Sequence, residues 1–413
     1  MPAAIKIAIT SLILISSSVH ALEYDLKQDQ SLLSLVKVAV NTKDLGRFQI
    51  RPARTMRSAE QPILTCIDSD GKQTNLAYQE KAQCDQVTWQ LPLSPVKKSG
   101  FDISSQVDSY DADKGWFFIS EFNSLPRFIR IKTENKAAEP IKTTVCLPRK
   151  KCEILPDESQ PPLFMFWGIE PVQLAINGKA VEVFSDTELL LNALSRWKPT
   201  LDLQLNYLVS LFPSSHEQGW AVTYIGRDKK TGSVSGAAGN NMILVNVPLE
   251  DGELNDQALQ MLLKITAHES IHILDKRNMP LWAAEGLAEY YAIKSLNKAA
   301  FKMASPNEQW LKFNKVFPLS DTGLLKASEL VSEQNQYQYY PLFYVKAPAF
   351  WQAIDEALAA KGASLDDFVS RLNFDSNYQI SEASQQELVS VMGKDVWLNI
   401  SQQYLLTTVL TSE

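Results

Sequence analysis

The pattern of hydrophobic and polar positions changes partway along this 413-residue chain. Before residue 157, short apolar runs such as 48–50, 87–89 and 116–119 alternate with polar turns. Short apolar runs bounded by turn residues predict strands. We therefore expect a β-rich N-terminal domain over residues 22–157, built as a sandwich or a half-open sheet, with Trp89 and Trp116 in its core.

After a polar, proline-bearing stretch at residues 158–162, the pattern mixes strands and helices. Apolar runs predict strands at 163–167, 172–176, 181–184, 220–225 and 242–247, and the last two bracket a loop of small residues at 232–241. Helical periodicity runs from 189 to 212 with a break at Pro199, and it dominates after residue 254. We expect a mixed α and β domain over residues 158–295 and a helical C-terminal part over 296–413.

One helix is predicted with particular clarity. No Gly or Pro interrupts residues 254–276, and apolar residues recur there at helical spacing. Lys276 and Arg277 are expected in its last turn, where cations favour the helix dipole. Pro280 ends the helical pattern, and a second helix is expected from about Leu281.

The first of these helices carries His268-Glu269-Ser270-Ile271-His272. Residues four apart lie one turn apart on the same side of a helix, so both imidazoles can reach one metal ion. Zinc in a hydrolytic site usually takes three protein ligands. Glu285, on a second helix folded back across the turn, can supply the third. We predict one zinc ion per chain held by His268, His272 and Glu285, with Glu269 as the general base.

An H-E-x-x-H sequence alone can occur by chance. Here the helical context, the short turn and the sequence Glu285-Gly286-Leu287-Ala288-Glu289-Tyr290 agree with a metal site. Glu289 follows Glu285 by one turn, so Glu289 could orient a histidine ligand, as could Asp275. The alternative for both residues is a solvated helix face.

These motifs resemble the gluzincin zinc peptidases, and most closely the aminopeptidase N-like family, which carries H-E-x-x-H and then E-G-[FL]-A-x-Y. The resemblance covers roughly residues 163–400 and implies a thermolysin-like zincin catalytic domain, although the family's spacing between His and Glu is usually longer. Tyr344-Val345-Lys346-Ala347 is similar to the family's Y-x-K-G, with Ala in place of Gly. The resemblance implies that Tyr344 polarises the scissile carbonyl, with Tyr339 and Tyr340 as rivals.

The family's G-x-M-E-N loop lies beside the substrate, and its Glu holds the substrate's free amino group. Here Gly236, Ala237, Ala238, Gly239 and Asn240 take its place, so Gly239 stands where that Glu would be. A buried ammonium needs a paired carboxylate, which makes aminopeptidase activity doubtful. The loop can still offer backbone hydrogen bonds to an extended peptide.

The mechanism expected from these residue types is hydrolysis of a peptide bond. Zinc lowers the pKa of its bound water towards neutrality. Glu269 accepts the proton of this water and passes it to the leaving amine, while zinc and Tyr344 stabilise the oxyanion. The alternative function is a catalytically inactive or weakly active module with a zincin fold that acts as a binding protein. The intact Glu269 favours the peptidase.

The first 21 residues have the pattern of a signal peptide, with Lys6 before the apolar run 7–15 and Val19-His20-Ala21 as a cleavage site. We therefore expect a periplasmic or secreted protein with no stable membrane anchor. The cysteines agree with export. Their proximity in sequence predicts disulfides Cys66–Cys84 and Cys146–Cys152, with a four-cysteine zinc site as the alternative.

The charge balance bears on the partners. The chain has a formal net charge of −7, and loss of Lys6 with the leader would make it more negative. An acidic chain without basic patches argues against nucleic acid. The expected partner is therefore a peptide or protein substrate, and the sequence predicts no oligomeric state.

Overall fold

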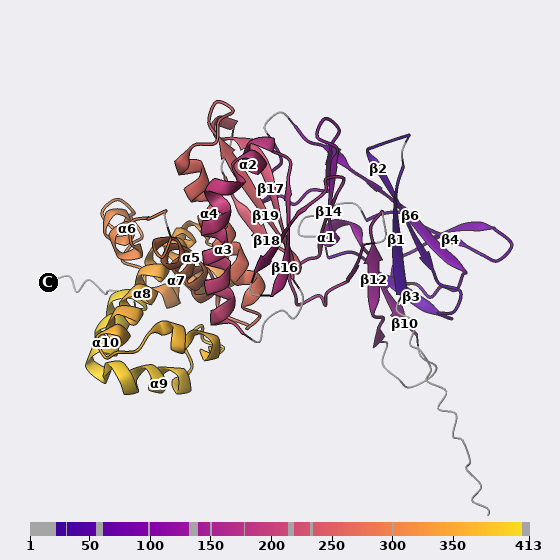
Figure 1. Ribbon diagram of the computed structural model, residues 1–413. Helices are drawn as coiled ribbons and strands as arrows, with labels where there is room; N and C mark the ends of the chain where they lie inside the picture. Colours follow the sequence, from indigo (N-terminus) through magenta and orange to yellow (C-terminus); the bar gives the residue numbers. More distant parts are fainter. Residues whose placement is uncertain are drawn as a thin grey trace, which may run out of the picture.

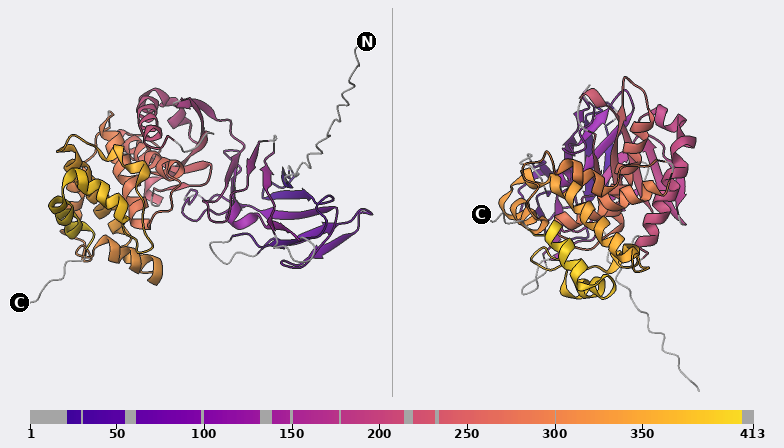
Figure 2. Two further views of the ribbon diagram at one scale, coloured as in Figure 1. Left: turned by 90° about the horizontal axis from the view of Figure 1, so that it is seen from below. Right: turned by 90° about the vertical axis from the view of Figure 1, so that its left-hand side faces the viewer.

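The computed structural model describes residues 22–29, 31–54, 61–97, 100–131, 139–148, 151–176, 178–213, 219–231, 234–299 and 301–406. The expected signal peptide lies outside these residues. The β-rich first part and the helical last part lie at opposite ends of an elongated molecule (Figures 1 and 2). Within the described residues, no helix combines the length and the hydrophobicity needed to cross a bilayer.

The first part contains the expected β-rich region. A seven-stranded sheet has the order β13-β12-β1-β2-β6-β4-β5, and a three-stranded sheet has the order β11-β10-β3. Alternating burial explains the arrangement: along β2, the side chains of Val36, Val38 and Val40 point into the core. The strands are β1 (Leu22–Gln28), β2 (Leu35–Asn41), β3 (Phe48–Arg51), β4 (Leu64–Ile67), β5 (Gln73–Leu76), β6 (Gln86–Pro92), β10 (Arg127–Arg130), β11 (Glu139–Pro140), β12 (Thr143–Cys146) and β13 (Cys152–Ile154).

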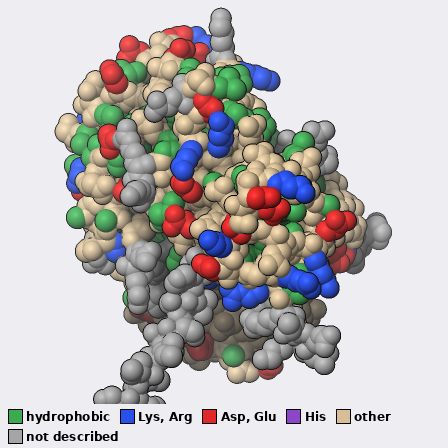
Figure 3. Space-filling view, turned by 90° about the vertical axis from the view of Figure 1, so that its right-hand side faces the viewer, with side chains coloured by type: hydrophobic (Ala, Val, Ile, Leu, Met, Phe, Trp, Pro, Cys, Tyr) green, Lys and Arg blue, Asp and Glu red, His purple; other side chains and the backbone are tan. Residues whose placement is uncertain are grey.

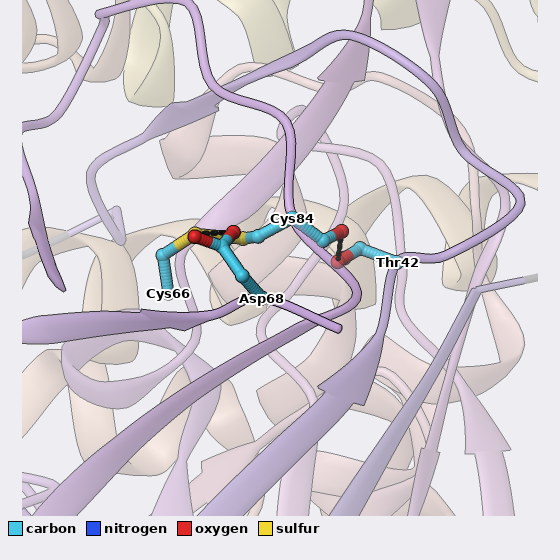
Figure 4. The surroundings of a disulfide bond; sticks show 4 residues. All are labelled: Thr42, Cys66, Asp68 and Cys84. Carbon is cyan, nitrogen blue, oxygen red and sulfur yellow. Dashed lines mark hydrogen bonds between the residues drawn. A yellow bond between two sulfur atoms is a disulfide. The ribbon is translucent and has the colours of Figure 1, made fainter. Parts of the chain in front are cut away.

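Both predicted cysteine pairs are bonded in the structure, so the four cysteines do not form a shared metal site. Cys66 on β4 is linked to Cys84, and Cys146 on β12 is linked to Cys152 on β13. Figure 4 shows the first pair, beside which the Thr42 hydroxyl donates a hydrogen bond of 2.7 Å to the carbonyl of Cys84. On the end face of this part of the molecule, acidic and basic side chains are interspersed (Figure 3).

A four-stranded sheet stands between the two ends of the molecule (Figure 1). Its order is β14-β9-β8-β7, with β7 (Ser94–Pro95), β8 (Ser109–Asp111), β9 (Trp116–Ser120) and β14 (Phe164–Trp167). The expected domain division between residues 157 and 158 does not match this pairing, because β14 follows the division and β9 precedes it. Cross-strand aromatic pairs explain why: Phe117 stacks on Trp167 and Phe118 meets Phe164 edge-on.

The second part is built on a five-stranded sheet with the order β15-β16-β17-β19-β18. The strands are β15 (Val172–Ile176), β16 (Lys179–Ser185), β17 (Trp220–Asp228), β18 (Gly236–Ala238) and β19 (Met242–Leu249). The three central strands are parallel, and the edge strands β15 and β18 are antiparallel to their neighbours. Part of the expected small-residue loop is therefore the edge strand β18.

The five-stranded sheet is buried on both faces. On one face, side chains such as Val222 and Val245 share a core with helices α3 (Leu194–Leu211) and α4 (Asp256–Leu274). On the other face, Ala221, Ile225 and Leu244 share a core with aromatic residues of the four-stranded sheet. Helix α3 runs through Pro199, its sixth residue, without the expected break.

Helix α4 ends earlier than the charge pattern predicts. Its last residue is Leu274, so Lys276 and Arg277 lie beyond the last turn. The physical reason is that Asp275 has an extended backbone and its carboxylate accepts hydrogen bonds from the backbone and guanidinium of Arg277. Helix α5 (Leu281–Asn297) then begins after Pro280, as expected.

The remaining chain is helical. Helix α5 crosses α8 (Pro341–Ala359) so closely that a Cβ atom on Gly286 would lie 2.6 Å from the Cβ of Ala347. The other α-helices are α1 (Glu121–Ser124), α2 (Glu188–Asn192), α6 (Pro306–Phe313), α7 (Leu324–Gln334), α9 (Glu382–Met392) and α10 (Lys394–Tyr404).

Candidate metal centre

Three potential ligand atoms meet between α4 and α5. The Nε2 atoms of His268 and His272 are 3.2 Å apart, and Glu285 Oε2 lies 3.2 Å from the first and 3.6 Å from the second. Tetrahedral zinc with ligand bonds of about 2.0–2.1 Å separates its ligand atoms by roughly 3.3 Å. Two imidazole nitrogens and one carboxylate oxygen at this spacing therefore fit a zinc ion. Among the described residues, this is the one group of three such donors within 4.8 Å of one another.

Local sequence positions these donors. The side chain of Asn255 caps α4 by accepting a hydrogen bond of 2.8 Å from the backbone of Ala258. The uninterrupted helix then presents both histidines one turn apart on the side that faces α5. Because only six residues separate the end of α4 from the start of α5, α5 turns back against α4 and brings Glu285 to the histidines.

Glu289 contacts the far nitrogen of His268. Its Oε2 lies 3.2 Å from His268 Nδ1, and its other oxygen pairs with Lys264. A carboxylate at Nδ1 favours the proton on that nitrogen and leaves Nε2 free as a ligand. Asp275, the other predicted orienting residue, is engaged by Arg277 instead. Of the two predicted orienting carboxylates, Glu289 is therefore the one that contacts His268.

Negative charge around the imidazoles favours a cation. Burial opposes a charged His268, but its hydrogen bonds to Glu285 and Glu289 prevail and raise the pKa of His268 to about 10. Burial would raise the pKa of Glu285, yet hydrogen bonds with His268 and His272 hold this pKa well below its usual range. Either a proton or a divalent metal ion satisfies this preference for positive charge.

Glu269 lies beside the edge strand β18. A Cβ atom on Gly236 would lie 2.7 Å from Glu269 Oε1, so only glycine leaves room for the carboxylate in this position. Burial raises the pKa of Glu269, while both histidines and a hydrogen bond from the backbone of Ala238 act in the opposite direction. A carboxylate with a raised pKa beside this candidate metal site is suited to accept and return a proton.

Two tyrosines, Tyr340 and Tyr344, lie close to Glu285. The ring of Tyr344 stacks on the ring of His268 with centroids 5.7 Å apart, and Tyr340 packs against Tyr344. Burial and the charge of Glu285 raise the pKa of Tyr344 above its usual range and the pKa of Tyr340 to about 12. Both hydroxyls therefore stay protonated at neutral pH and can donate. Tyr339 lies on the short turn before α8 and is partly buried.

The residues at 236–240, which were predicted to contact the substrate, differ in how open their surroundings are. Strand β18 pairs with β19 on one side only, and the backbone groups of Gly236 and Ala238 point away from β19. Gly239 is closed to any side chain, because a Cβ atom there would lie 2.6 Å from the ring of Phe164 and 2.8 Å from the carbonyl of Pro162. Asn240 donates its backbone N–H to the same carbonyl at 2.7 Å.

A cleft of about 1910 Å³ opens between the N-terminal sheets and the five-stranded sheet. His272 and Asn240 line it from the second part of the chain, and the strand β13 lines it from the first. Lys151, just before that strand, pairs with Glu182 on β16, and Glu153, within the strand, accepts a hydrogen bond from Asn241. Sequence reasoning missed both residues, since only the nearby Cys152 marked this segment.

By sequence, the chain matches no protein-family model and no curated protein. By structure, it is similar to an aminopeptidase N family protein from Idiomarina loihiensis, with a TM-score of 0.58 and 12% identity over 94% of this chain and 77% of that one. It also matches an M1 zinc metallopeptidase from Deinococcus radiodurans, with a TM-score of 0.45 and 10% identity over 94% of each chain. The first likeness shows a shared multidomain fold of mixed sheets with a helical C-terminal part.

Proposed function

We propose that this chain is an exported zinc-dependent metallopeptidase of the gluzincin type. The observation that carries the proposal is the set of three donor atoms at zinc spacing, with the carboxylate of Glu269 next to it. The similarity in fold to an aminopeptidase N family protein supports it. The two disulfides support a periplasmic or secreted location.

His268, His272 and Glu285 would hold the zinc ion, which supplies Lewis acidity for water and for the scissile carbonyl. Glu269 accepts a proton from the attacking water and delivers it to the nitrogen of the leaving amine as the C–N bond breaks. Tyr344 donates a hydrogen bond to the developing oxyanion, with Tyr340 beside it as the second candidate. Glu289 keeps His268 in the required tautomer.

An extended peptide fits the exposed edge of β18. The N–H of Ala238 is engaged by Glu269, but the backbone groups of Gly236 and the carbonyl of Ala238 point away from β19 and can pair with a substrate strand, as in other edge-strand recognition. Gly239 provides no carboxylate for an N-terminal ammonium, and Phe164 and Pro162 leave no space for a side chain at this position. This arrangement favours recognition of the peptide backbone over recognition of a free amino terminus.

The test compares zinc content and turnover on a peptide library for the wild type, Glu269→Gln and His272→Ala. Glu269→Gln should keep its zinc and lose at least ~10²-fold in kcat, the usual scale for a general base. His272→Ala should lose the zinc as well. If Glu269→Gln hydrolyses peptides as fast as the wild type, the peptidase proposal fails and a binding module with this fold takes its place.

A further inference from the structure

The cleft beside the metal centre holds a lysine whose charge no neighbour cancels. Lys276 lines the cleft together with His272, and it follows that histidine by four residues. No described residue forms a salt bridge or a side-chain hydrogen bond with the ammonium of Lys276. Its sequence neighbours offer none, because Asp275 and Arg277 are engaged with each other.

Most other charges of the cleft are compensated. On the N-terminal wall, Arg51 lies 3.5 Å from Glu158, and Lys151 pairs with Glu182 across the cleft. Arg127 pairs with the buried Glu121. Lys276 therefore stands out as a free positive charge on the wall that carries the metal ligands, within a chain whose net charge is −7.

The position of Lys276 also favours an ion pair with a ligand. The cleft walls remove part of the hydration of its side chain, which lowers its pKa although the side chain remains exposed to the cleft. A cation that has lost some water gains more from a carboxylate than a fully hydrated surface lysine does.

We propose that Lys276 forms a specificity subsite that binds a carboxylate of the peptide substrate near the scissile bond. The carboxylate belongs either to an acidic side chain or to the C-terminus of a short substrate. Both have the same chemistry and differ in where the chain is cut. The inference rests on the proposed peptidase function and deepens it by naming a substrate class.

The experiment uses the zinc-loaded full chain and quenched fluorescent peptides of one neutral sequence. One series moves a single Glu through each position of an amidated peptide, and a second series compares a free C-terminus with the amide at different distances from the cut. The wild type should prefer one carboxylate position by about 10-fold or more in kcat/KM, the scale of a charge-assisted hydrogen bond. An effect in the first series identifies an acidic side chain, and an effect only in the second identifies the C-terminus.

The variants are Lys276→Met, Lys276→Arg and, as a control outside the cleft, Lys361→Met, which replaces an exposed lysine. Lys276→Met should abolish the preference, so that its kcat/KM for the acidic peptide is no higher than its kcat/KM for the neutral peptide. Lys276→Arg should retain most of the preference, and Lys361→Met should leave it unchanged. An unchanged preference in Lys276→Met, or no carboxylate preference in the wild type, overturns the proposal.

A binding measurement separates this proposal from the peptidase function. In the Glu269→Gln background, fluorescence anisotropy should show tighter binding of the preferred acidic peptide than of its neutral form. Adding Lys276→Met should remove that difference. If the wild type cleaves no peptide but the difference in binding depends on Lys276, the subsite stands and the hydrolytic function fails. If the difference is absent, the subsite fails whatever the turnover.

Discussion

At the scale of single residues, the absence of a side chain at Gly236 determines where Glu269 lies. We predict that Gly236→Ala lowers kcat by about 10²-fold, the usual cost of displacing a catalytic group by roughly 1 Å. The added Cβ atom would lie 2.5 Å from Ile265 and 2.7 Å from Glu269 Oε1, so the carboxylate must move. Zinc content should stay at the wild-type value, since the atoms nearest to the added Cβ belong to Ile265 and Glu269 and not to the three donor residues. Full turnover in Gly236→Ala would show that Glu269 works from another position.

Lys346 gives a pH-dependent prediction. Burial lowers the pKa of Lys346 to about 8, and its ammonium donates to the carbonyls of Ser320 and Thr322 at 3.0 and 2.9 Å. Between pH 8 and the unfolded value of 10.5, the unfolded chain binds more protons than the folded one, so folding becomes more favourable as pH rises. Below pH 8, the full free-energy cost of burying the charged Lys346 ammonium reduces the stability of the folded chain.

The measurement is the free energy of unfolding of the wild type and Lys346→Met between pH 7 and 9.5. The wild type should gain stability relative to the variant as pH rises above 8, by at most about 1.4 kcal/mol per pH unit. Lys394→Met, which replaces an exposed lysine on α10, should show no such trend against the wild type. If the stability of the wild type relative to Lys346→Met stays constant or falls as pH rises above 8, the lowered pKa of a buried Lys346 is contradicted.

At the scale of elements, the crossing of α5 and α8 determines the position of Tyr344 relative to Glu285. Replacing Gly by Ala inside a helix normally stabilises it by roughly 0.5–1 kcal/mol. We predict the opposite sign for Gly286→Ala, because the new methyl group would lie 2.6 Å from the Cβ of Ala347. Overpacking of this kind costs about 1–3 kcal/mol.

The matched variant is Gly286→Ala combined with Ala347→Gly, which moves the methyl group from α8 to α5 and places Gly at the fourth position of the Y-x-K-G pattern. Unfolding midpoints of both single variants and the double variant form a thermodynamic cycle. The double variant should be more stable than the sum of the single effects by about 1 kcal/mol or more. Additive effects would mean that the two helices do not meet at this pair.

The helices that carry the metal ligands could be predicted because their information is local. The spacing of His268 and His272 on one helix, and the short turn before Glu285, restrict geometry within about twenty residues. The end of α4 could not be predicted from helix periodicity, since it depends on the contact between Asp275 and Arg277. Gly239 could be recognised as a departure, but the ring that closes this position comes from Phe164, 75 residues earlier.

At the scale of the whole molecule, the β-rich start, the mixed sheet and the helical end were all expected, whereas the way the first two join was not. Apolar periodicity identifies strands but does not specify their partners, so the pairing of β14 with β9 was not predicted. The cleft depends on the same long-range arrangement. Lys151 and Glu153 reach it only because β13 lies opposite β16 and the loop at Asn241.

The core shared by the four-stranded and five-stranded sheets has a consequence for dividing the chain. A fragment of residues 158–413 would keep every proposed metal ligand but would lose β9. The edge of β14 would then be unpaired, and Phe164 and Phe166 would lose their ring contacts with Phe118 and Trp116. Unpaired apolar strand edges promote aggregation. We predict that this fragment is insoluble or binds little zinc, whereas the full chain is soluble and binds one ion. Solubility and elemental analysis of both would test it, and a soluble, zinc-loaded fragment would contradict it. The part of the chain that carries the proposed metal ligands thus depends for its solubility on β9, an aromatic strand that holds none of the ligand atoms.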